Sequence, residues 1–356
     1  MKSFLGLWAI VAVVCVAYLV FWPVPVDPKP WNAPKNPGYS GAFEPNERLK
    51  QLTFLDIAGR SGPEDIAIGP DGMLYIAVHD GEILRCAQNG GQTEVFATTK
   101  GRPLGIEFGP DGVLYVADAY LGLLAIDPQG QVSLLADSAD GVPIRYANDV
   151  DIAADGTIFF TDASTRFGAK AHGGTLPASI LDLIEHSSNG RVLKYDPQTG
   201  KATLFTNGLT FPNGISIGAN GDVYVAETGT YSVWRYAPDG TGRQVLRNLP
   251  GFPDNLNAAP DGSFWLGLVS PRNPIVDRLS ARPRLRQAIL RLPETMRPAP
   301  KRYGFVLRMD AEGRVLETLQ DPAGSYALTT GAITAADGSI FVSSLTERRL
   351  GVLPAN

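Results

Sequence analysis

Cysteine and histidine are both scarce in this chain of 356 residues, which has two cysteines and three histidines. Cys15 lies in an apolar N-terminal segment, so it is not expected to pair with Cys86, and a disulfide framework is excluded as the basis of the fold. His172 and His186 belong to a loop insertion, and His79 does not lie at the repeated position described below. A histidine-based site is therefore not indicated.

Several common functional motifs are also missing. The chain has no GxSxG turn for a serine nucleophile and no glycine-rich phosphate loop. Its formal net charge of −5 gives no reason to expect a nucleic acid partner. No protein partner can be inferred either.

The one long hydrophobic run covers residues 4–22 and consists of 19 apolar residues. A run of this length can cross a bilayer as a helix, and Lys2 before it favours a topology with the N-terminus inside. A cleaved signal peptide is the alternative, but no good small-x-small cleavage site follows. The sequence therefore predicts a cytoplasmic N-terminus at 1–3, a single-pass transmembrane signal anchor at 4–22 and a proline-rich extended linker at 23–48, with the rest of the chain on the extracytoplasmic side.

A tight turn of the Asp-Gly or Asn-Gly type recurs six times, each time between two short apolar segments. The turns begin at Asp71, Asp111, Asp155, Asn220, Asp261 and Asp337. A third and a fourth segment usually follow, and units of four short strands are typical of propeller blades. The sequence predicts an all-β fold, a six-bladed β-propeller over 49–356 behind the N-terminal transmembrane helix. The last unit has only three strands, so the segment 49–57 is expected to supply the fourth and close the ring.

Two units are longer than the others, through insertions near 163–190 and 270–302. Each insertion connects the second strand of its unit to the third, and the second insertion is rich in arginine with a basic amphipathic helix expected inside it. By blade geometry both insertions emerge on one face of the propeller. They are expected to form a lid or a specificity element, with decorative loops as the alternative.

The residue seven positions before each turn carries a side-chain oxygen in most of the units. Four of the six positions hold Glu64, Asn148, Asn213 and Asp254. Equivalent positions of a closed array face one axis, so these side chains are expected to converge on one point. Oxygen ligands without His or Cys suit Ca²⁺ and fit Zn²⁺ poorly. The register therefore predicts a calcium site, the alternative being strand-capping residues around a water-filled channel.

Six short motifs connect the chain to known proteins: GRPLGI (101–106), ANDV (147–150), FTDAS (160–164), FPNGI (211–215), GFPDN (251–255) and LSARP (279–283). Through them the chain resembles the strictosidine synthase-like and adipocyte plasma membrane-associated protein-like family, within the calcium-dependent six-bladed propellers that include gluconolactonases and paraoxonases. The resemblance implies a catalytic calcium held by the four residues above, with Asn255 nearby. Paraoxonase also implies a second, structural calcium at Asp65 and Asp149, although strand alternation alone points these two side chains away from the first site.

Two departures from these relatives bear on activity. Leu104 stands where paraoxonase-type enzymes carry a catalytic histidine, and Gly331 and Ala332 occupy the stretch where strictosidine synthase carries its glutamate. In gluconolactonase and fluorophosphatase relatives, the aspartate that matches Asp254 acts as base or nucleophile. The resemblance therefore implies that Asp254 is the catalytic residue.

The resulting hypothesis is a membrane-anchored, calcium-dependent hydrolase, a lactonase or arylesterase acting on a small-molecule substrate. Arg102, two residues before Leu104, is expected to orient the substrate, with an ordinary surface salt bridge as the alternative. Two other functions stay open. One is a lyase of the strictosidine synthase type that catalyses a Pictet–Spengler condensation, and the other is a calcium-stabilised binding propeller without catalysis.

Overall fold

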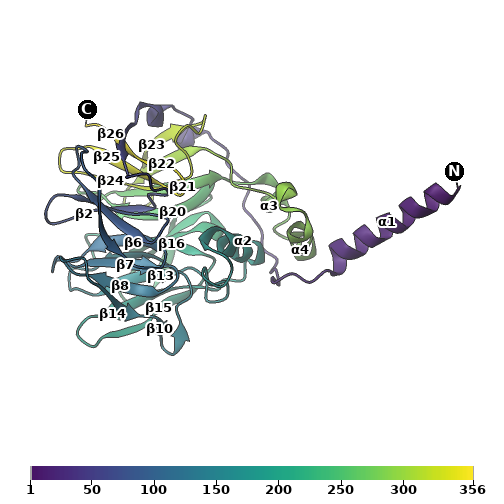
Figure 1. Ribbon diagram of the computed structural model, residues 1–356, viewed down its shortest axis with the longest axis horizontal. Helices are drawn as coiled ribbons and strands as arrows, with labels where there is room; N and C mark the ends of the chain where they lie inside the picture. Colours follow the sequence, from purple (N-terminus) through teal and green to yellow (C-terminus); the bar gives the residue numbers. More distant parts are fainter. Residues whose placement is uncertain (1, 356) are drawn as a thin grey trace.

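Six four-stranded antiparallel sheets surround a central axis in the computed structural model, which describes residues 2–355 but not the side chains of 2–6 and 9 (Figure 1). The first strand of each sheet lies beside the first strand of the next, in the order β2, β6, β12, β16, β20, β24 and back to β2. The predicted all-β, six-bladed propeller is confirmed.

The sheets follow one another along the chain. Their strands, from the axis outward, are β2 (Asp65–Ile68), β3 (Leu74–Ala77), β4 (Glu82–Cys86) and β5 (Glu94–Thr98) in blade one; β6 (Pro103–Phe108), β7 (Leu114–Asp118), β8 (Gly122–Ile126) and β9 (Val132–Ala136) in blade two; β12 (Ala147–Ile152), β13 (Ile158–Asp162), β14 (Gly190–Asp196) and β15 (Lys201–Leu209) in blade three. Blade four has β16 (Pro212–Ile217), β17 (Val223–Glu227), β18 (Ser232–Tyr236) and β19 (Gly242–Leu246); blade five has β20 (Gly251–Ala258), β21 (Phe264–Pro271), β22 (Gly304–Met309) and β23 (Val315–Asp321).

The sixth blade joins residues that are far apart in sequence. It consists of β24 (Thr329–Thr334), β25 (Ile340–Ser344), β26 (Arg349–Leu353) and β1 (Thr53–Asp56). Strand β1 pairs antiparallel with β26, with Thr53 opposite Val352 and Asp56 opposite Arg349. The expected closure of the ring by the N-terminal part of the propeller is confirmed, because β26 would otherwise present an unpaired edge.

The repeated turns share one hydrogen bond, which explains why the sequence pattern marks the blades so clearly. In blade one the Asp71 carboxylate accepts a bond from the backbone N–H of Met73 at 3.0 Å, and Gly72 has a φ of +76°. The first residue of each of the other five turns accepts the same bond from the residue two positions later. An Asx bond followed by a glycine with positive φ fixes a tight turn between two antiparallel strands.

Both insertions emerge at the same end of the propeller. The first contains α2 (Thr175–Glu185), and the second contains α3 (Pro274–Arg278), α4 (Pro283–Arg291) and the short 3₁₀ turn η4 (Glu294–Met296). The remaining short elements are a small hairpin, β10 (Ser138–Ala139) with β11 (Val142–Pro143), and the 3₁₀ turns η1 (Gly41–Phe43), η2 (Arg48–Gln51) and η3 (Thr228–Thr230).

The segment predicted as an extended linker is packed between the two insertions. The backbone N–H of Lys29 donates to the carbonyl of Glu185 at the end of α2 across 2.8 Å. The N–H of Trp31 donates to Ser280 between α3 and α4, and the Trp31 ring stacks on His186 with ring centroids 4.0 Å apart. We call residues 24–33 the strap, because they connect α2 to α3 and α4.

A helix, α1 (Lys2–Phe21), precedes the strap and projects away from the propeller on the side of α3 and α4 (Figure 1). The sequence predicted a membrane span at 4–22 in this region. Among the residues that the structure describes, no helix is both long and apolar enough to cross a membrane. The predicted cytoplasmic end at 1–3 includes Met1, which lies outside the described residues.

Candidate metal centre and active site

A β-bulge recurs near the start of the first strand in five of the six blades. The pairing of β12 with β13 shifts register between Ala147 and Val150, and that of β16 with β17 shifts between Pro212 and Ile215. The first strands of blades two, five and six shift at the equivalent place. A bulge bends the strand and re-aims a side chain. Asn148, Asn213 and Asp254 all lie in these bulges.

Glu64 is the point at which residues of several blades meet. Arg102 of blade two donates from Nη2 to the Glu64 carboxylate oxygen Oε2 at 3.0 Å. The Asn255 amide of blade five and the Thr330 hydroxyl of blade six both donate to the Glu64 backbone carbonyl, at 2.9 and 2.7 Å. These bonds join Glu64, Arg102 and Asn255, the predicted residues of blades one, two and five.

The two carboxylates of the predicted calcium site have different neighbours. Asp254 is buried, and burial together with the negative charge of Glu64 raises the pKa of the Asp254 carboxyl well above its usual value, while a hydrogen bond from Asn213 opposes the shift. Burial also raises the pKa of Glu64, and the Arg102 guanidinium opposes that shift. A cation beside Asp254 would oppose this rise in pKa, because an opposite charge favours the ionised form.

Two amide oxygens support a cation at this place. Asn213 Oδ1 and Asn255 Oδ1 are buried and accept no hydrogen bond in the described part of the chain. A buried carbonyl oxygen without a donor is costly, and calcium prefers carboxylate and amide oxygens. The donor set therefore fits Ca²⁺. No cluster of three or more His, Cys, Asp or Glu residues within 2–355 is arranged to hold a metal, since this set contains only two carboxylates beside its amides.

Asp65 and Asp149, predicted for a second calcium, join neighbouring blades. Asp65 Oδ2 accepts from the backbone N–H of Ile106 at 2.9 Å, and Asp149 Oδ2 accepts from that of Ile215 at 2.8 Å. Gly105 passes so close to Asp149 that a Cβ there would lie 2.1 Å from the carboxylate oxygen. Burial raises the pKa of Asp65 to about 7 and that of Asp149 well above its usual value. Their role as ligands stays a prediction.

Two further acidic side chains of the inner strands, Asp151 and Glu107, were not identified from the sequence. Asp151, two residues after Asp149, accepts from the backbone N–H of Ile217 at 2.7 Å. Burial and the charge of Asp151 raise the pKa of Glu107 to about 8. The spacing of two residues between Asp149 and Asp151 was the available signal, because residues two apart in a strand share a face.

Arg102 is buried, in contrast to the surface salt bridge that was considered as an alternative. Its side chain is 3% exposed, that of Glu64 is 4% exposed, and its Nη1 donates to the carbonyl of Pro103 at 2.9 Å. Nε of Arg102 has no acceptor in the described part of the chain. Arg102 thus supplies one positive charge inside the candidate calcium site, and a role in substrate binding stays a prediction.

An apolar cluster packs beside the polar ring and brings the insertions and the strap together. Its buried members are Val26, Leu104, Ala119, Tyr146, Ala163, Phe167, Ala169, Ala178, Phe211 and Leu290. The Tyr146 hydroxyl donates to the carbonyl of Thr175 at the start of α2 across 2.9 Å, and its ring packs edge to face on Phe211 with centroids 5.2 Å apart. Leu104 therefore belongs to an apolar cover, which the sequence did not reveal because its members come from segments spread between residues 26 and 290.

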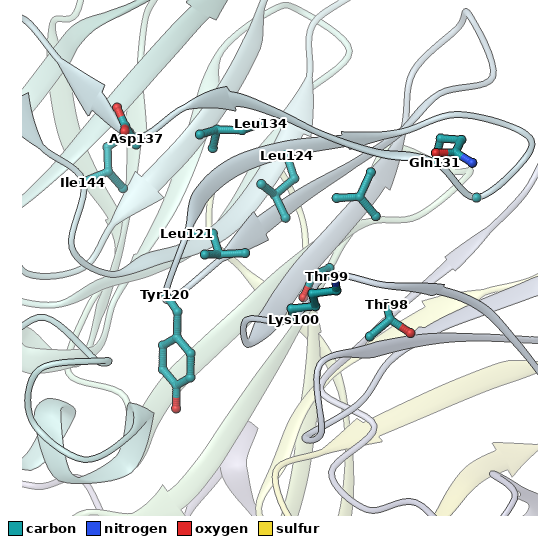
Figure 2. Close-up of a pocket in the computed structure, with 12 residues that line it drawn as sticks. Thr98, Thr99, Lys100, Tyr120, Leu121, Leu124, Gln131, Leu134, Asp137 and Ile144 are labelled. Atoms are coloured by element: carbon teal, nitrogen blue, oxygen red, sulfur yellow. The ribbon is translucent and has the colours of Figure 1, made fainter.

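The surface pocket shown in Figure 2 is not part of this site. It has a volume of about 660 Å³ and is lined by residues of blades one and two, including Thr99, Tyr120, Leu124 and Leu134. None of the predicted ligands lines it. The candidate site is defined by converging polar side chains beneath an apolar cover.

The chain is similar to known families and proteins over most of its length. Residues 41–86 match the family model "Strictosidine synthase-like, N-terminal", and residues 67–289 match "SMP-30/Gluconolactonase/LRE-like region". Adipocyte plasma membrane-associated protein of Bos taurus is 32% identical, over 96% of this chain and 88% of that protein. Protein strictosidine synthase-like 3 of Arabidopsis thaliana is 31% identical, over 85% of each chain.

Solved structures support the fold. The calcium-binding protein regucalcin of Agrobacterium tumefaciens superposes with a TM-score of 0.59 at 15% identity, covering 85% of this chain and 93% of that one. At this identity the similarity concerns the arrangement of the blades.

Proposed function

The chain belongs to the strictosidine synthase-like family within the SMP-30/gluconolactonase group, and from this premise we propose that it is a calcium-dependent hydrolase of small lactones or aryl esters. The observation that carries the proposal is the pair of buried, unpartnered amide oxygens of Asn213 and Asn255 next to Glu64 and Asp254. A bound Ca²⁺ at these oxygens would act as a Lewis acid on the substrate carbonyl.

Asp254 is the proposed base. No Lys or Arg forms a salt bridge with it in the described part of the chain, and Asn213 donates a hydrogen bond to its carboxyl. In the proposed reaction Asp254 takes a proton from water as the water oxygen bonds to the carbonyl carbon. The C–O bond to the ring or aryl oxygen then breaks, and that oxygen leaves as the alcohol or phenol with the proton that Asp254 took from water.

The other buried residues have supporting roles in this proposal. Arg102 holds Glu64 in place through the 3.0 Å ion pair, and the cover around Tyr146, Leu104 and Phe211 limits access of water. Limited water strengthens electrostatic interactions within the site. Direct attack of Asp254 on the carbonyl carbon is the covalent alternative, in which water later hydrolyses the acyl-enzyme.

Membrane attachment through α1 is part of the proposal. The apolar run at 4–22 and the name of the bovine relative, a plasma membrane-associated protein, support it. The full-length chain is then expected in the membrane fraction at its uncleaved mass, with the propeller on the extracytoplasmic side. A mature protein that begins near residue 24 would show instead that the run is a signal peptide.

The test of activity is hydrolysis of a panel of lactones and aryl esters, measured with calcium and with a chelator. We expect turnover that is lost with the chelator, restored by calcium and absent from Asp254→Asn. Asp151→Asn is the matched control, because it removes a carboxylate of the same channel outside the proposed ligand set. If no substrate of the panel is turned over in a way that depends on calcium and Asp254, the binding propeller becomes the better description.

A further inference from the structure

The second insertion forms a strongly basic surface on an acidic protein. Residues 271–302 contain nine arginines and lysines against Asp277 and Glu294, a net charge of +7 in a chain whose formal net charge is −5. Three of the nine, Arg272, Arg286 and Arg291, are buried, and the other six are exposed. The exposed residues of this surface include both arginines and large apolar side chains. We call the set Ile275, Arg278, Arg282, Arg284, Leu285 and Met296 the basic–apolar face.

The buried arginines of the insertion bond to groups within the protein, whereas its exposed arginines on α3 and α4 have no acidic partner in the described chain. Arg272 pairs with Asp277 at 2.9 Å. Arg286 donates to the carbonyls of Ile184 in α2 and Lys29 in the strap. These bonds fix α3 and α4 on the propeller, and in the described chain no carboxylate lies within salt-bridge distance of Arg278, Arg282 or Arg284.

The apolar members of the face are exposed. Ile275 is 55% exposed, Leu285 is 46% exposed and Met296 is 65% exposed. They lie on α3, α4 and η4, within 22 residues of one another. Exposed apolar side chains among arginines are typical of surfaces that contact the boundary between lipid headgroups and acyl chains.

The end of α1 lies against the same insertion. Arg291 at the end of α4 donates from Nε to the carbonyl of Trp22 at 2.6 Å and from Nη1 to that of Leu19 at 2.9 Å. The side chains of Phe21 and Trp22 are exposed there. Arg291 therefore attaches the apolar helix to the element that carries the basic–apolar face (Figure 1).

We propose that the basic–apolar face rests on an anionic lipid surface, as a second membrane contact beside α1. This inference extends the proposed attachment through α1, and charge complementarity selects lipid with anionic headgroups as the occupant. Each arginine near such a surface contributes about 1 kcal/mol of attraction in general, and the apolar side chains add buried area. The contact would hold the end of the propeller that carries α2, α3 and α4 toward the membrane.

Fluorescence quenching on the full chain tests the inference. A polarity-sensitive probe is attached to Leu285→Cys in a Cys15→Ser background, which leaves Cys86 as the one native cysteine, and Cys86 is buried. The protein is reconstituted into phosphatidylcholine vesicles with or without phosphatidylserine, and with brominated acyl chains as the quencher. We expect quenching at position 285 of about twofold or more with phosphatidylserine, and less without it.

Three controls separate the possible results. A probe at Leu204→Cys, an exposed residue of β15 in blade three, is expected to show no quenching. A probe on native Cys15 reports α1 alone. The triple variant Arg278→Gln, Arg282→Gln, Arg284→Gln is expected to lose most of the quenching at 285.

Quenching at Cys15 without quenching at 285 overturns the inference and leaves attachment by α1 intact. Quenching at 285 without quenching at Cys15 supports the face and refutes attachment by α1. Equal quenching at 285 with and without phosphatidylserine, unaffected by the triple variant, overturns the proposed preference for anionic lipid.

Discussion

Arg102 donates to Glu64 across 3.0 Å, and this buried ion pair places an internal positive charge among the predicted ligands of calcium. The guanidinium occupies one of the two carboxylate oxygens and repels a second cation nearby. Arg102 is therefore expected to compete with calcium for Glu64, whatever its role toward a substrate.

Replacing Arg102 with methionine is expected to strengthen calcium binding by about tenfold or more, because a repulsive charge is removed and both oxygens of Glu64 become free. Without calcium the variant is expected to lose about 3–5 kcal/mol of stability, since a buried carboxylate is left unpaired. Calorimetric titration and thermal melts with and without calcium measure both effects. Arg191→Met is the matched control, because it breaks a buried pair with Asp162 outside the site. Unchanged or weaker calcium binding in Arg102→Met would contradict the competition.

Glu64 and Asp254 are expected to respond differently to excess calcium. Glu64→Gln should weaken calcium binding and lower activity through the metal, so added calcium should restore much of the activity. Asp254→Asn keeps a ligand oxygen but loses the base, so calcium should restore hardly any. The measurement is turnover against calcium concentration for each variant. Equal recovery would mean that Asp254 is only a ligand.

Asp182 is expected to make stability depend on pH. This α2 residue accepts a bond from Ser164 at 2.6 Å, and burial raises the pKa of its carboxyl to about 7, with Glu185 adding to the shift and Asn189 and Arg166 opposing it. The folded protein then holds a proton that the unfolded chain releases near pH 4, so this contribution to stability is present at low pH and lost as pH rises to about 7.

Asp182→Asn should remove that dependence and stabilise the protein at pH 8 by on the order of 3 kcal/mol. Urea denaturation at several pH values between 4 and 8 checks it, with the exposed Asp137→Asn as the control. If the free energy of unfolding of the wild type changes between pH 4 and 8 in the same way as that of Asp182→Asn, the assignment is wrong.

The strap is expected to stabilise the cover of the site. Arg286→Met removes the bonds from α4 to Ile184 and Lys29, each of which is charge-assisted and contributes about 1.5–3 kcal/mol in general. We expect faster amide hydrogen exchange in 24–33 and in α2, with little change in blades one and six. Arg284→Met, on the exposed side of α4, is the control. Unchanged exchange in the strap would show that it is held by other contacts.

The fold was predictable because its pattern is local and repeated. Each turn carries its own Asx bond and glycine, so six copies of one short motif define the blades. The approach of Glu64 and Asn213 to Asp254 follows from the same register. The identity of the bound ion and the reaction do not follow from register, since they depend on charge balance around the site.

Other features depended on contacts between distant segments. Arg102 was predicted near the site, but its pairing with Glu64 joins residues of two blades and has no sequence signal. The proline-rich composition of 23–48 predicted an extended linker. It gave no sign that Val26 and Trp31 would pack against the insertions, because the surfaces that receive them form only in the folded chain.

The pairing of β1 with β26 has a consequence for biosynthesis. Thr53 and Val352 are 299 positions apart, so a ribosome that makes 5–20 residues per second needs about 15–60 seconds between them. During that interval β1 has no partner, and Thr330, which binds the carbonyl of Glu64, is added only near its end. Closure of the propeller is therefore among the last steps of folding, and a nascent chain released before β26 would leave β25 and β1 without their shared partner.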